Sequence, residues 1–540
     1  MATSENITFF SICSAAYLAQ ARCLFRSLRE HHAAAKLKLV LIDQAHDARN
    51  LLESDIDIVL AKDIAGDIFY QLALDYDAEE LSAALKPFAF RYFLSHDDSP
   101  IAYVAPDSFA YSHFHELMET LASGANIVLT PRNTRPIGHG RTPNEAGLLA
   151  DGAINPGLIA VAPGPEAAAF LSWWSSRVAG PKIAGATQVP HDRWLDLVPS
   201  FFEGAHIHKH PGYGVAHWNI FQRVMTRRGA AWFADGAPLR LFHFSRLPLD
   251  DITAFATDQD RLAADAIGPF RNELESYLAR LASCGTPAES AYPYALMYEG
   301  QQIDSRGLRQ ALRNLELSGR SDSPKTFAAA EDAIGELLAP PPGLPAHEPF
   351  PISRLLYARW AASPKLQAEF PLFDGAQRAR FLYWAMTAGY VDLDIPLSLL
   401  PWRELGRPVA NPLAKHVQLP AVVWMIWLAE PQVRQACPTL NDMGVARLLG
   451  HLLEDIYTGK RPGTLFQAAE LGATVLGEGR DAVSLAELAV WTGRKDLQGA
   501  FDLNTLDGRT AFRRWVEQFP PPEAPWTPFA FPLAAQVAHA

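Results

Sequence analysis

Apolar and polar positions alternate in two different ways along the first 250 or so residues. Short apolar runs, each ended by a charged or turn-forming residue, are typical of buried strands. They occur at ITFFSIC (7–13), LKLVLID (37–43), IDIVLA (56–61), IAYV (101–104) and ANIVLTP (125–131). Between them, apolar residues recur at helical spacing at 17–28, 78–96 and 113–123. This alternation predicts an α/β domain with a mostly parallel sheet.

The pattern changes after about residue 258, where strand signals become rare and helical spacing dominates. The stretch PPPGLPAHEPFP (340–351) predicts a proline-rich linker. We therefore expect an α/β domain at 1–255, a helical connector at 256–339, the linker, and an α-helical domain at 352–540. The apolar run LPAVVWMIWLAEP (419–431) is shorter than the roughly 18 residues of a membrane span and predicts a buried helix.

The helical part contains an internal repeat. The segments 359–384 and 490–515 align without a gap at an offset of 131 residues. Their shared positions are Trp360/Trp491, Leu366/Leu497, Gln367/Gln498, Phe370/Phe501, Leu372/Leu503, Arg378/Arg509, Phe381/Phe512 and Trp384/Trp515. A fainter copy lies between them, where Trp427 and Pro438 match Trp360 and Pro371 at an offset of 67. The spacing predicts about three helical units of about 65 residues, which either duplicate core packing or form a groove for an acceptor or partner protein.

Composition and charge exclude some classes of protein. A chain of 540 residues, 49% hydrophobic and 20% charged, is typical of a globular protein with more than one core. The net charge of −12 argues against nucleic acid as the main partner, since phosphate backbones need a basic surface. The four cysteines are scattered without metal-ligand spacing, and the first residues lack the basic region of a signal peptide. These features predict reduced thiols and a cytoplasmic protein without a membrane span.

One carboxylate stands out because of its place in the pattern. In IAYVAPDSFAYSHF (101–114) an apolar strand ends in Pro106 and Asp107 before the next helix begins. Ligands of open α/β sheets bind at the carboxyl ends of strands. Asp107 is therefore a candidate for a metal or phosphate site, and an ordinary turn residue is the alternative.

The order of motifs resembles bacterial glycosyltransferases of the GT-A fold, those of the glycogenin and lipopolysaccharide galactosyltransferase group. The resemblance covers about residues 7–249. Its pieces, in order, are FFSICSAAYLAQARCLFRSLREHH, LKPFAFRYFL, IAYVAPDSF, NIVLTPR, DGAINPGLIAV, FLSWW, HDRWLDLVPSFF, HPGYGVAHWNIFQR and PLRLFHFSR. Each piece is weak alone, and the specificity lies in nine pieces in the right order. The helical repeats are also similar to C-terminal extensions of such enzymes.

The resemblance implies a Rossmann-type domain that binds a nucleotide-sugar. Such a donor leaves behind a diphosphate, whose growing charge Mn²⁺ or Mg²⁺ stabilises through carboxylate oxygens, with imidazole tolerated by Mn²⁺. The implied metal ligands are Asp107 and His243, and the implied donor contacts are Ser11, Asp43, Ala105, Asp107, Asn155 and Gly157. Trp218 and Asn219 are the implied acceptor contacts, and Asp192 is the implied base or ion-pair stabiliser.

The sequence departs from the family pattern at several of these positions. Ala105 stands where the family has the first aspartate of an Asp-x-Asp pair, which contacts both ribose and metal. Arg193 follows Asp192 where an Asp-Gln pair is common, Gly214 replaces an asparagine, and Arg246 replaces a glycine. The loss at Ala105 implies weaker metal binding, or a transfer of the charge-neutralising role to Lys86 or to Arg246, whose guanidinium can grip a diphosphate with two donors.

Each candidate has a plainer structural alternative. Arg246 then lies on the surface after a strand, His243 is a satisfied core histidine, Asn155 and Gly157 form a turn into a strand, and Asp192 is a carboxylate near a helix N-terminus. The alternating histidines of HIHKH (206–210) predict one strand face, which is either a transition-metal site or a wet surface. Trp173 and Trp174 either pack in the core or cover the acceptor site.

These observations predict a cytoplasmic glycosyltransferase of polysaccharide assembly that moves a hexose from a nucleotide-sugar to a hydroxyl of a glycan, lipid-linked glycan or protein. Retention of the anomeric configuration is the preferred outcome, and partner docking on the helical domain and peripheral attachment to the inner membrane through a partner stay open. The alternative is a degenerate fold that binds a sugar nucleotide, or scaffolds glycan assembly, without turnover. An active enzyme that works without metal, through Arg246 and Lys86, is a third reading.

Overall fold

A computed structural model describes the fold. The residues it describes are 6–43, 53–138, 140–180, 191–248, 256, 259–260, 264–285, 292–313, 324, 326–341, 349–372, 374–405, 408–410, 418–440, 448, 451–452, 474–484, 487–488, 490–491 and 494–518. Contacts divide the chain into a first unit, 1–295 with 315–327, and a second unit, 296–314 with 328–540. The three predicted domain boundaries stay a prediction, and most of the proline-rich linker lies outside the described residues.

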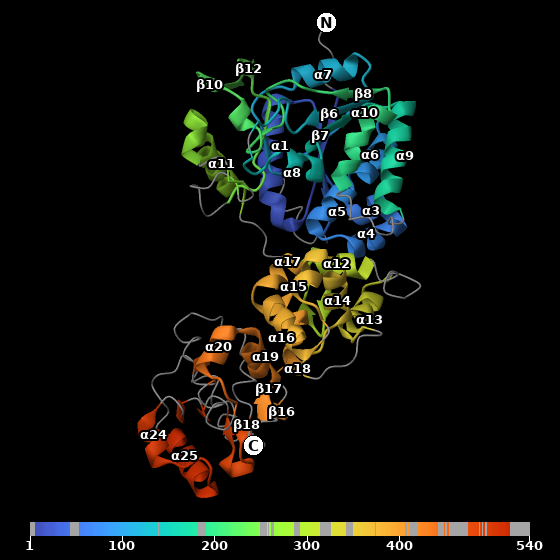
Figure 1. Ribbon diagram of the computed structural model, residues 1–540. Coiled ribbons are helices and arrows are strands. Elements are labelled where there is room, and N and C mark those ends of the chain that lie inside the picture. Colours follow the sequence, from blue (N-terminus) through green and yellow to red (C-terminus); the bar gives the residue numbers. More distant parts are fainter. Residues whose placement is uncertain are drawn as a thin grey trace. The chain divides into compact units, whose positions relative to one another are not determined.

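A seven-stranded sheet forms the centre of the first unit, and the predicted α/β class is confirmed (Figure 1). Its strands, in spatial order, are β3 (Ile56–Leu60), β2 (Lys36–Leu41), β1 (Thr8–Cys13), β4 (Ile101–Val104), β7 (Ile154–Val161), β6 (Ile127–Pro131) and β8 (Ala205–Ile207). Neighbouring strands from β3 to β4 are parallel, as are β6 and β8. Only β7, among these seven, runs antiparallel to both of its neighbours.

The direction of β7 determines which strand ends lie together at one edge of the sheet. Because β7 is reversed, its first residues lie beside the carboxyl ends of β4 and β6: Val104 pairs with Leu158, and Thr130 with Asn155. Parallel strands bring their carboxyl ends to a common edge. We call this edge, formed by the ends of β2, β1, β4 and β6 and the start of β7, the carboxyl edge.

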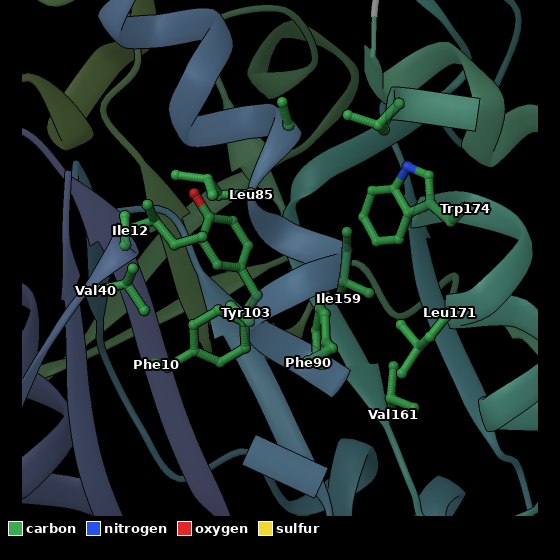
Figure 2. Close-up of a cluster of buried hydrophobic side chains, with 14 of the residues drawn as sticks. Phe10, Ile12, Val40, Leu85, Phe90, Tyr103, Ile159, Val161, Leu171 and Trp174 are labelled. Carbon is green, nitrogen blue, oxygen red and sulfur yellow. The ribbon is translucent and has the colours of Figure 1, made fainter. Parts of the chain in front are cut away.

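Helices cover both faces of the sheet. The first unit contains α1 (Leu18–His31), α3 (Ala61–Ala65), α4 (Phe69–Asp75), α5 (Ala78–Ala84), α6 (Lys86–Leu94), α7 (His115–Ala122), α8 (Glu145–Asp151), α9 (Pro165–Ala179), α10 (Val198–Phe201) and α11 (Arg271–Cys284). One core cluster joins α4, α5, α6 and α9 to one face, and another joins α1 and α7 to the other. Figure 2 shows the first cluster, in which Phe10, Tyr103 and Leu85 lie together and Trp174 packs with Leu171.

Two small sheets complete the first unit. β5 (Ser108–Ala110), β13 (Leu241–His243) and β9 (Val215–Ala216) form one, in the order β5-β13-β9. β10 (Met225–Arg228), β11 (Ala231–Ala234) and β12 (Ala237–Pro238) form the other. In the first of these sheets His243 pairs with Ser108, so two segments that are 135 positions apart in the chain meet directly after Asp107.

The second unit is mostly helical. Its helices are α12 (Arg306–Arg313), α13 (Phe327–Leu338, which begins at the unit boundary), α14 (Arg354–Ala361), α15 (Pro364–Glu369), α16 (Gly375–Trp384), α17 (Tyr390–Leu393), α18 (Trp402–Leu405), α19 (Ala421–Ala429), α20 (Pro431–Ala436), α24 (Lys495–Ala500) and α25 (Leu506–Gln518). Short ribbons pair β14 (Met297–Tyr298) with β15 (Gln301–Gln302), β16 (Pro408–Ala410) with β17 (Gln418–Pro420), and β18 (Thr474–Leu476) with β19 (Val483–Ser484). Strands of two or three residues are too short to leave an alternating pattern, so the sequence does not predict them.

The aligned tryptophans of the repeat make the same contact. The indole N–H groups of Trp360, Trp427 and Trp491 each donate to the carbonyl ten residues later, at 2.8, 2.8 and 2.9 Å. In the first and last copies the next aromatic pair also recurs, with Phe370–Phe381 and Phe501–Phe512 both at 5.7 Å and 55°. These contacts lie inside the copies, which supports duplicated core packing; the number of repeats stays a prediction.

The apolar run at 419–431 forms α19, in which Val422, Val423, Met425 and Ile426 are buried, as the sequence predicts. Among the described residues, no helix combines the length and apolar character that crossing a bilayer requires. All four cysteines are buried and unbridged.

Candidate functional site at the carboxyl edge

Asp107 and His243 form a close pair at the carboxyl edge. His243 Nε2 lies 2.7 Å from Asp107 Oδ1, with the two side chains 12% and 23% exposed. The backbone holds the pair in place: the Phe244 N–H donates to the Asp107 carbonyl at 2.8 Å, and β13 lies beside β5. We call these two residues the Asp107–His243 pair, and the structure thus brings together the two predicted metal ligands.

The electrostatics of the pair keep the carboxylate ionised. Burial acts to raise the pKa of Asp107, but the charge of His243 and its hydrogen bond outweigh burial, so the pKa is lowered from its ordinary value. Within the described residues, Ser108 Oγ, which directly follows Asp107, and His243 Nδ1 have no hydrogen-bond partner.

The pair fits a divalent cation by donor type. The 2.7 Å between Nε2 and Oδ1 is a hydrogen-bond distance, so the pair would exchange this bond for bonds to the cation. Carboxylate oxygen and imidazole nitrogen together suit Mn²⁺. Within the described residues no third histidine, cysteine or carboxylate joins them. A cation held here therefore depends on water and on substrate oxygens for its other ligands.

Gly157 lies directly against the pair. An added Cβ would lie 2.8 Å from His243 Nδ1 and 3.0 Å from Asn155 Oδ1. Asn155, which is 1% exposed, accepts from the Gly157 N–H at 2.9 Å. The Gly157 carbonyl accepts from the Ala105 N–H at 2.9 Å, which ties the start of β7 to the Ala105–Asp107 turn. Three predicted donor contacts, Ala105, Asn155 and Gly157, are thus adjacent to Asp107.

Gly157→Ala is expected to displace the His243 imidazole from Asp107, because the methyl group has no other space. If the pair holds a metal for the donor hydrolysis proposed below, that hydrolysis should fall about 10- to 100-fold, the usual effect of disturbing a residue that positions a metal ligand. The matched control is Gly147→Ala in α8, where an added Cβ meets its nearest atom at 3.9 Å. Hydrolysis rates measured at several Mn²⁺ concentrations check this, and equal rates for both variants would contradict it.

Gly214 explains one departure from the family pattern. Its φ is +58°, in the left-handed region that glycine and asparagine tolerate best. An added Cβ would lie 3.0 Å from Asn155 Nδ2. A glycine where the family has asparagine therefore preserves the backbone conformation. Arg246 also has a φ of +58°, at a position where the family has a glycine.

A second charged pair lies nearby. Lys86 Nζ donates to Asp192 Oδ1 at 3.1 Å, with the side chains 5% and 21% exposed. The Lys86 ammonium also lies 4.9 Å from the centre of the Tyr103 ring. Burial, followed by the charges of Asp107 and Asp192, raises the pKa of Tyr103. Tyr103 belongs to β4, the strand that leads into Asp107, so the Lys86–Asp192 pair and the Asp107–His243 pair lie along the same strand.

Arg246 lies at the rim of this region. Its Nη2 donates to Glu79 Oε1 at 2.9 Å, and both side chains are exposed. Its charge also helps to lower the pKa of Asp107. Tyr17, 47% exposed, lies beside these groups: partial burial and then the charges of Asp107 and Glu79 raise its pKa. In this structure Arg246 faces Glu79, and its predicted grip on a diphosphate stays a proposal.

The remaining predicted donor contacts differ in their placement. Asp43 follows β2, is 8% exposed, and accepts a hydrogen bond from the Ala15 N–H. Burial raises the pKa of Asp43. Ser11 lies within β1 and is 0% exposed, on the face that Phe9 and Cys13 turn toward α1. Its hydroxyl oxygen has no hydrogen-bond partner within the described residues, and its predicted donor contact stays a prediction.

The predicted acceptor residues also differ from each other. The Trp218 ring is perpendicular to that of His243, with centres 5.4 Å apart. Asn219 is 0% exposed, and its amide donates to the carbonyls of Arg132 at 2.6 Å and Gly214 at 2.8 Å. Its oxygen accepts from the Ala216 N–H at 3.0 Å. With every polar atom bonded to backbone, Asn219 fixes this loop and has no donor left for an acceptor.

The three histidines of HIHKH follow one another in a row, with 6.1 Å between the ring centres of His206 and His208 and of His208 and His210. β8 itself ends at Ile207, and His208 is 6% exposed, so the row is not a solvent-exposed strand face. His210 accepts from the Gly212 N–H at 3.1 Å and lies 3.5 Å from Glu116. Trp174 is 0% exposed, which confirms core packing for that residue, and Trp173 packs against Phe201 at 5.6 Å.

A cavity of about 770 Å³ lies at the opposite edge of the sheet. Its lining includes Lys36 and Lys38 at the start of β2. Lys36 pairs with Asp97 at 2.6 Å, and Lys38 with Asp57 at 3.0 Å. None of the site residues predicted from the sequence lines this cavity.

Comparison with known proteins adds the following. No family model matches the sequence, and no curated protein matches it. Among solved structures, the chain is similar to the galactosyltransferase LgtC in complex with donor and acceptor sugar analogues: identity is 12%, covering 53% of this chain and 98% of that one, with a TM-score of 0.34. It is also similar to the glycosyltransferase GlyE of Streptococcus pneumoniae TIGR4, with 15% identity over 53% of this chain and 65% of that one and a TM-score of 0.31. A third similar structure is mouse xyloside xylosyltransferase 1, with 12% identity over 38% of this chain and 85% of that one and a TM-score of 0.24. By their names, these three proteins are all glycosyltransferases.

Proposed function

We propose that the chain is a glycosyltransferase that uses a nucleotide-sugar donor. The observation that carries this is that two charged pairs lie along β4: Asp107–His243 directly after its end, and Lys86–Asp192 against the ring of Tyr103. One pair suits the diphosphate of the donor, and the other supplies a carboxylate for the reacting sugar. The order of sequence motifs supports the same reading.

Each group has a defined task in this proposal. Asp43 lies at the end of β2, where the nucleoside binds, and Asn155 and Gly157 line the sugar pocket. Asp107 and His243 would hold Mn²⁺ or Mg²⁺, which when bound supplies positive charge opposite the diphosphate. The bond between the anomeric carbon and the phosphate oxygen breaks, and the acceptor hydroxyl oxygen bonds to that carbon.

Asp192 accepts the proton of the acceptor hydroxyl or stabilises the positive charge on the sugar. Lys86, which is buried, holds this carboxylate in place through its hydrogen bond. Retention of the anomeric configuration is the outcome we propose. The acceptor is a hydroxyl of a glycan, a lipid-linked glycan or a protein, and it approaches beside Trp218.

A thermal-shift screen tests the proposal. The purified chain is melted with UDP-, GDP-, CMP- and dTDP-sugars, each with Mn²⁺ and with EDTA. A ligand at 100 times its Kd stabilises the folded state by about 2.7 kcal/mol, so we expect a higher Tm with one nucleotide class, in Mn²⁺ only. A shift that persists in EDTA would favour diphosphate binding by Arg246 and Lys86 without metal.

A second candidate function is favoured by Ala105. With no carboxylate at this position, one of the family's two acidic contacts to metal and ribose is missing. A chain that binds a sugar nucleotide or scaffolds glycan assembly without turnover would show no donor hydrolysis. If, in addition, no donor raises the Tm, only the scaffold role is left.

A further inference from the structure

Arg132 is a charged residue at the carboxyl edge to which the proposed reaction gives no role. It follows β6 directly, and its backbone is held on both sides. The Arg132 N–H donates to the Ala153 carbonyl at 2.8 Å, and the Arg132 carbonyl accepts from Asn219 Nδ2 at 2.6 Å. Its side chain therefore projects from a fixed point.

The guanidinium of Arg132 stacks on an aromatic ring of the candidate site. Its central carbon lies 5.6 Å from the centre of the Trp218 ring. Trp218 in turn contacts the His243 ring, at 5.4 Å and 90°. Arg132, Trp218 and the Asp107–His243 pair thus form a continuous row.

Arg132 differs from the other cations of the site because its charge is not neutralised. Lys86 pairs with Asp192 and Arg246 with Glu79. Across the described part of the chain no carboxylate pairs with Arg132, whose Nε makes one long contact, 3.4 Å to the Ile154 carbonyl. Its two Nη groups therefore remain available. In a chain of net charge −12, a half-buried cation without a counter-ion is suited to an anion from outside.

The strand order shows which part of the substrates lies near Arg132. The sheet runs β2-β1-β4-β7-β6, with Asp43 after β2, Asp107 after β4 and Arg132 after β6. Strands are about 4.8 Å apart, so β6 is about 10 Å beyond β4, on the side away from the nucleoside. An anion at Arg132 therefore belongs to the acceptor side and is separate from the donor diphosphate.

We propose that Arg132, held against Trp218, recognises an anionic oxygen group on the acceptor saccharide. The group is the carboxylate of a uronic acid or a phosphate substituent, since a guanidinium binds either with two parallel hydrogen bonds. That the bound saccharide is the acceptor rests on the proposed transfer reaction. That an anion binds at Arg132 rests on the row of contacts described above.

The test compares sugars that differ only in charge. Methyl glycosides of glucose, glucuronic acid and glucose 6-phosphate, with the matching galacto series, are titrated into the full chain by saturation-transfer NMR. We expect at least one anionic glycoside to bind about 10-fold or more tightly than its neutral counterpart, as for a charged hydrogen-bonded pair. The anionic glycoside with the higher affinity shows whether the site takes a carboxylate or a phosphate.

Variants make the test specific. Arg132→Ala and Arg132→Gln are expected to abolish the preference, and Arg132→Lys to keep part of it. The matched control is Arg227→Ala, because Arg227 also lies over a tryptophan, 5.7 Å from the Trp232 ring, but away from the site. Equal affinities in the unaltered chain, or a preference that survives in both Arg132→Ala and Arg132→Gln, would overturn the proposal.

Donor hydrolysis without acceptor, measured on the same preparations, separates the two proposals. Hydrolysis without an anion preference removes only the role of Arg132. An anion preference without hydrolysis keeps the anion site and counts against the transferase.

Discussion

Asp107→Ala is expected to reduce donor hydrolysis about 100- to 1,000-fold, which corresponds to about 3–4 kcal/mol of transition-state stabilisation. The reason is that Asp107 is the one carboxylate in contact with His243, and the neighbouring Ala105 cannot replace it. The thermal shift with donor and Mn²⁺ should be lost as well, because the cation loses its anionic ligand. Hydrolysis and melting of the same variant check both effects.

The control for Asp107→Ala is Asp57→Ala. Asp57 is a 70% exposed carboxylate of the same sheet, and it pairs with Lys38 at the opposite edge. Its removal should change hydrolysis by less than twofold and stability by about 0.5 kcal/mol or less. A normal rate in Asp107→Ala would make Asp107 a turn residue and would favour the metal-independent or scaffold readings.

Ala105→Asp offers an independent test in the opposite direction. If Ala105 marks a weakened metal site, the added carboxylate should lower the Mn²⁺ concentration needed for half-maximal hydrolysis about 10-fold or more. This is a gain of function, which a damaged fold cannot mimic. An unchanged requirement would place position 105 away from the cation.

Local patterns predicted the strands that form the centre of the sheet. β4 has the bounds of its apolar run, 101–104, because a strand covered on both faces reads as a continuous apolar stretch. The reversed direction of β7 leaves no such pattern in the sequence, since a strand has the same apolar periodicity whether it runs parallel or antiparallel to its neighbours. That reversal is what brings Asn155 and Gly157 to the carboxyl edge, so their placement was accessible only through motif order.

The contacts within the site depend on pairing between distant segments. Asp107 and His243 meet because β13 pairs with β5, and no spacing rule predicts a contact across 136 positions. The sequence did not predict a role for Arg132 for the same reason. A single arginine after a strand is common, and its meaning comes from Trp218, 86 positions later.

One predicted residue shows how motif matching transfers a role without its geometry. Asn219 matches a family piece, but it is fully buried and bonded entirely to backbone. Asn219 instead fixes the backbone of Arg132. Burial is a property of the packed fold, so a sequence motif alone cannot distinguish a contact with substrate from a support behind it.

Asp192→Asn is expected to lower donor hydrolysis about 100-fold, the usual contribution of a group that takes part in proton transfer or charge stabilisation. An amide keeps the shape of the carboxylate but carries no charge and accepts no proton. Donor binding, measured by thermal shift, should remain within a few fold, because Asp192 is not in the Asp107–His243 pair. Retained binding with lost turnover would distinguish Asp192 from Asp107.

The same substitution has a structural cost that must be separated from its effect on turnover. Lys86 is 4% exposed, and without Asp192 its charge lacks a partner. Because Asp192 is itself partly exposed, we expect a loss of about 1–3 kcal/mol in the free energy of unfolding. A lower Tm alone would therefore not show that Asp192 acts on substrate.

The double variant Lys86→Met with Asp192→Leu resolves this. Replacing a buried ion pair by apolar side chains of similar size is often neutral or stabilising, so the double variant should melt close to the unaltered chain. If Asp192 only neutralises Lys86, donor hydrolysis should return together with stability. If Asp192 faces the reacting sugar, stability should return while hydrolysis stays about 100-fold below that of the single variant Lys86→Met, and that separation would place the carboxylate in the reaction itself.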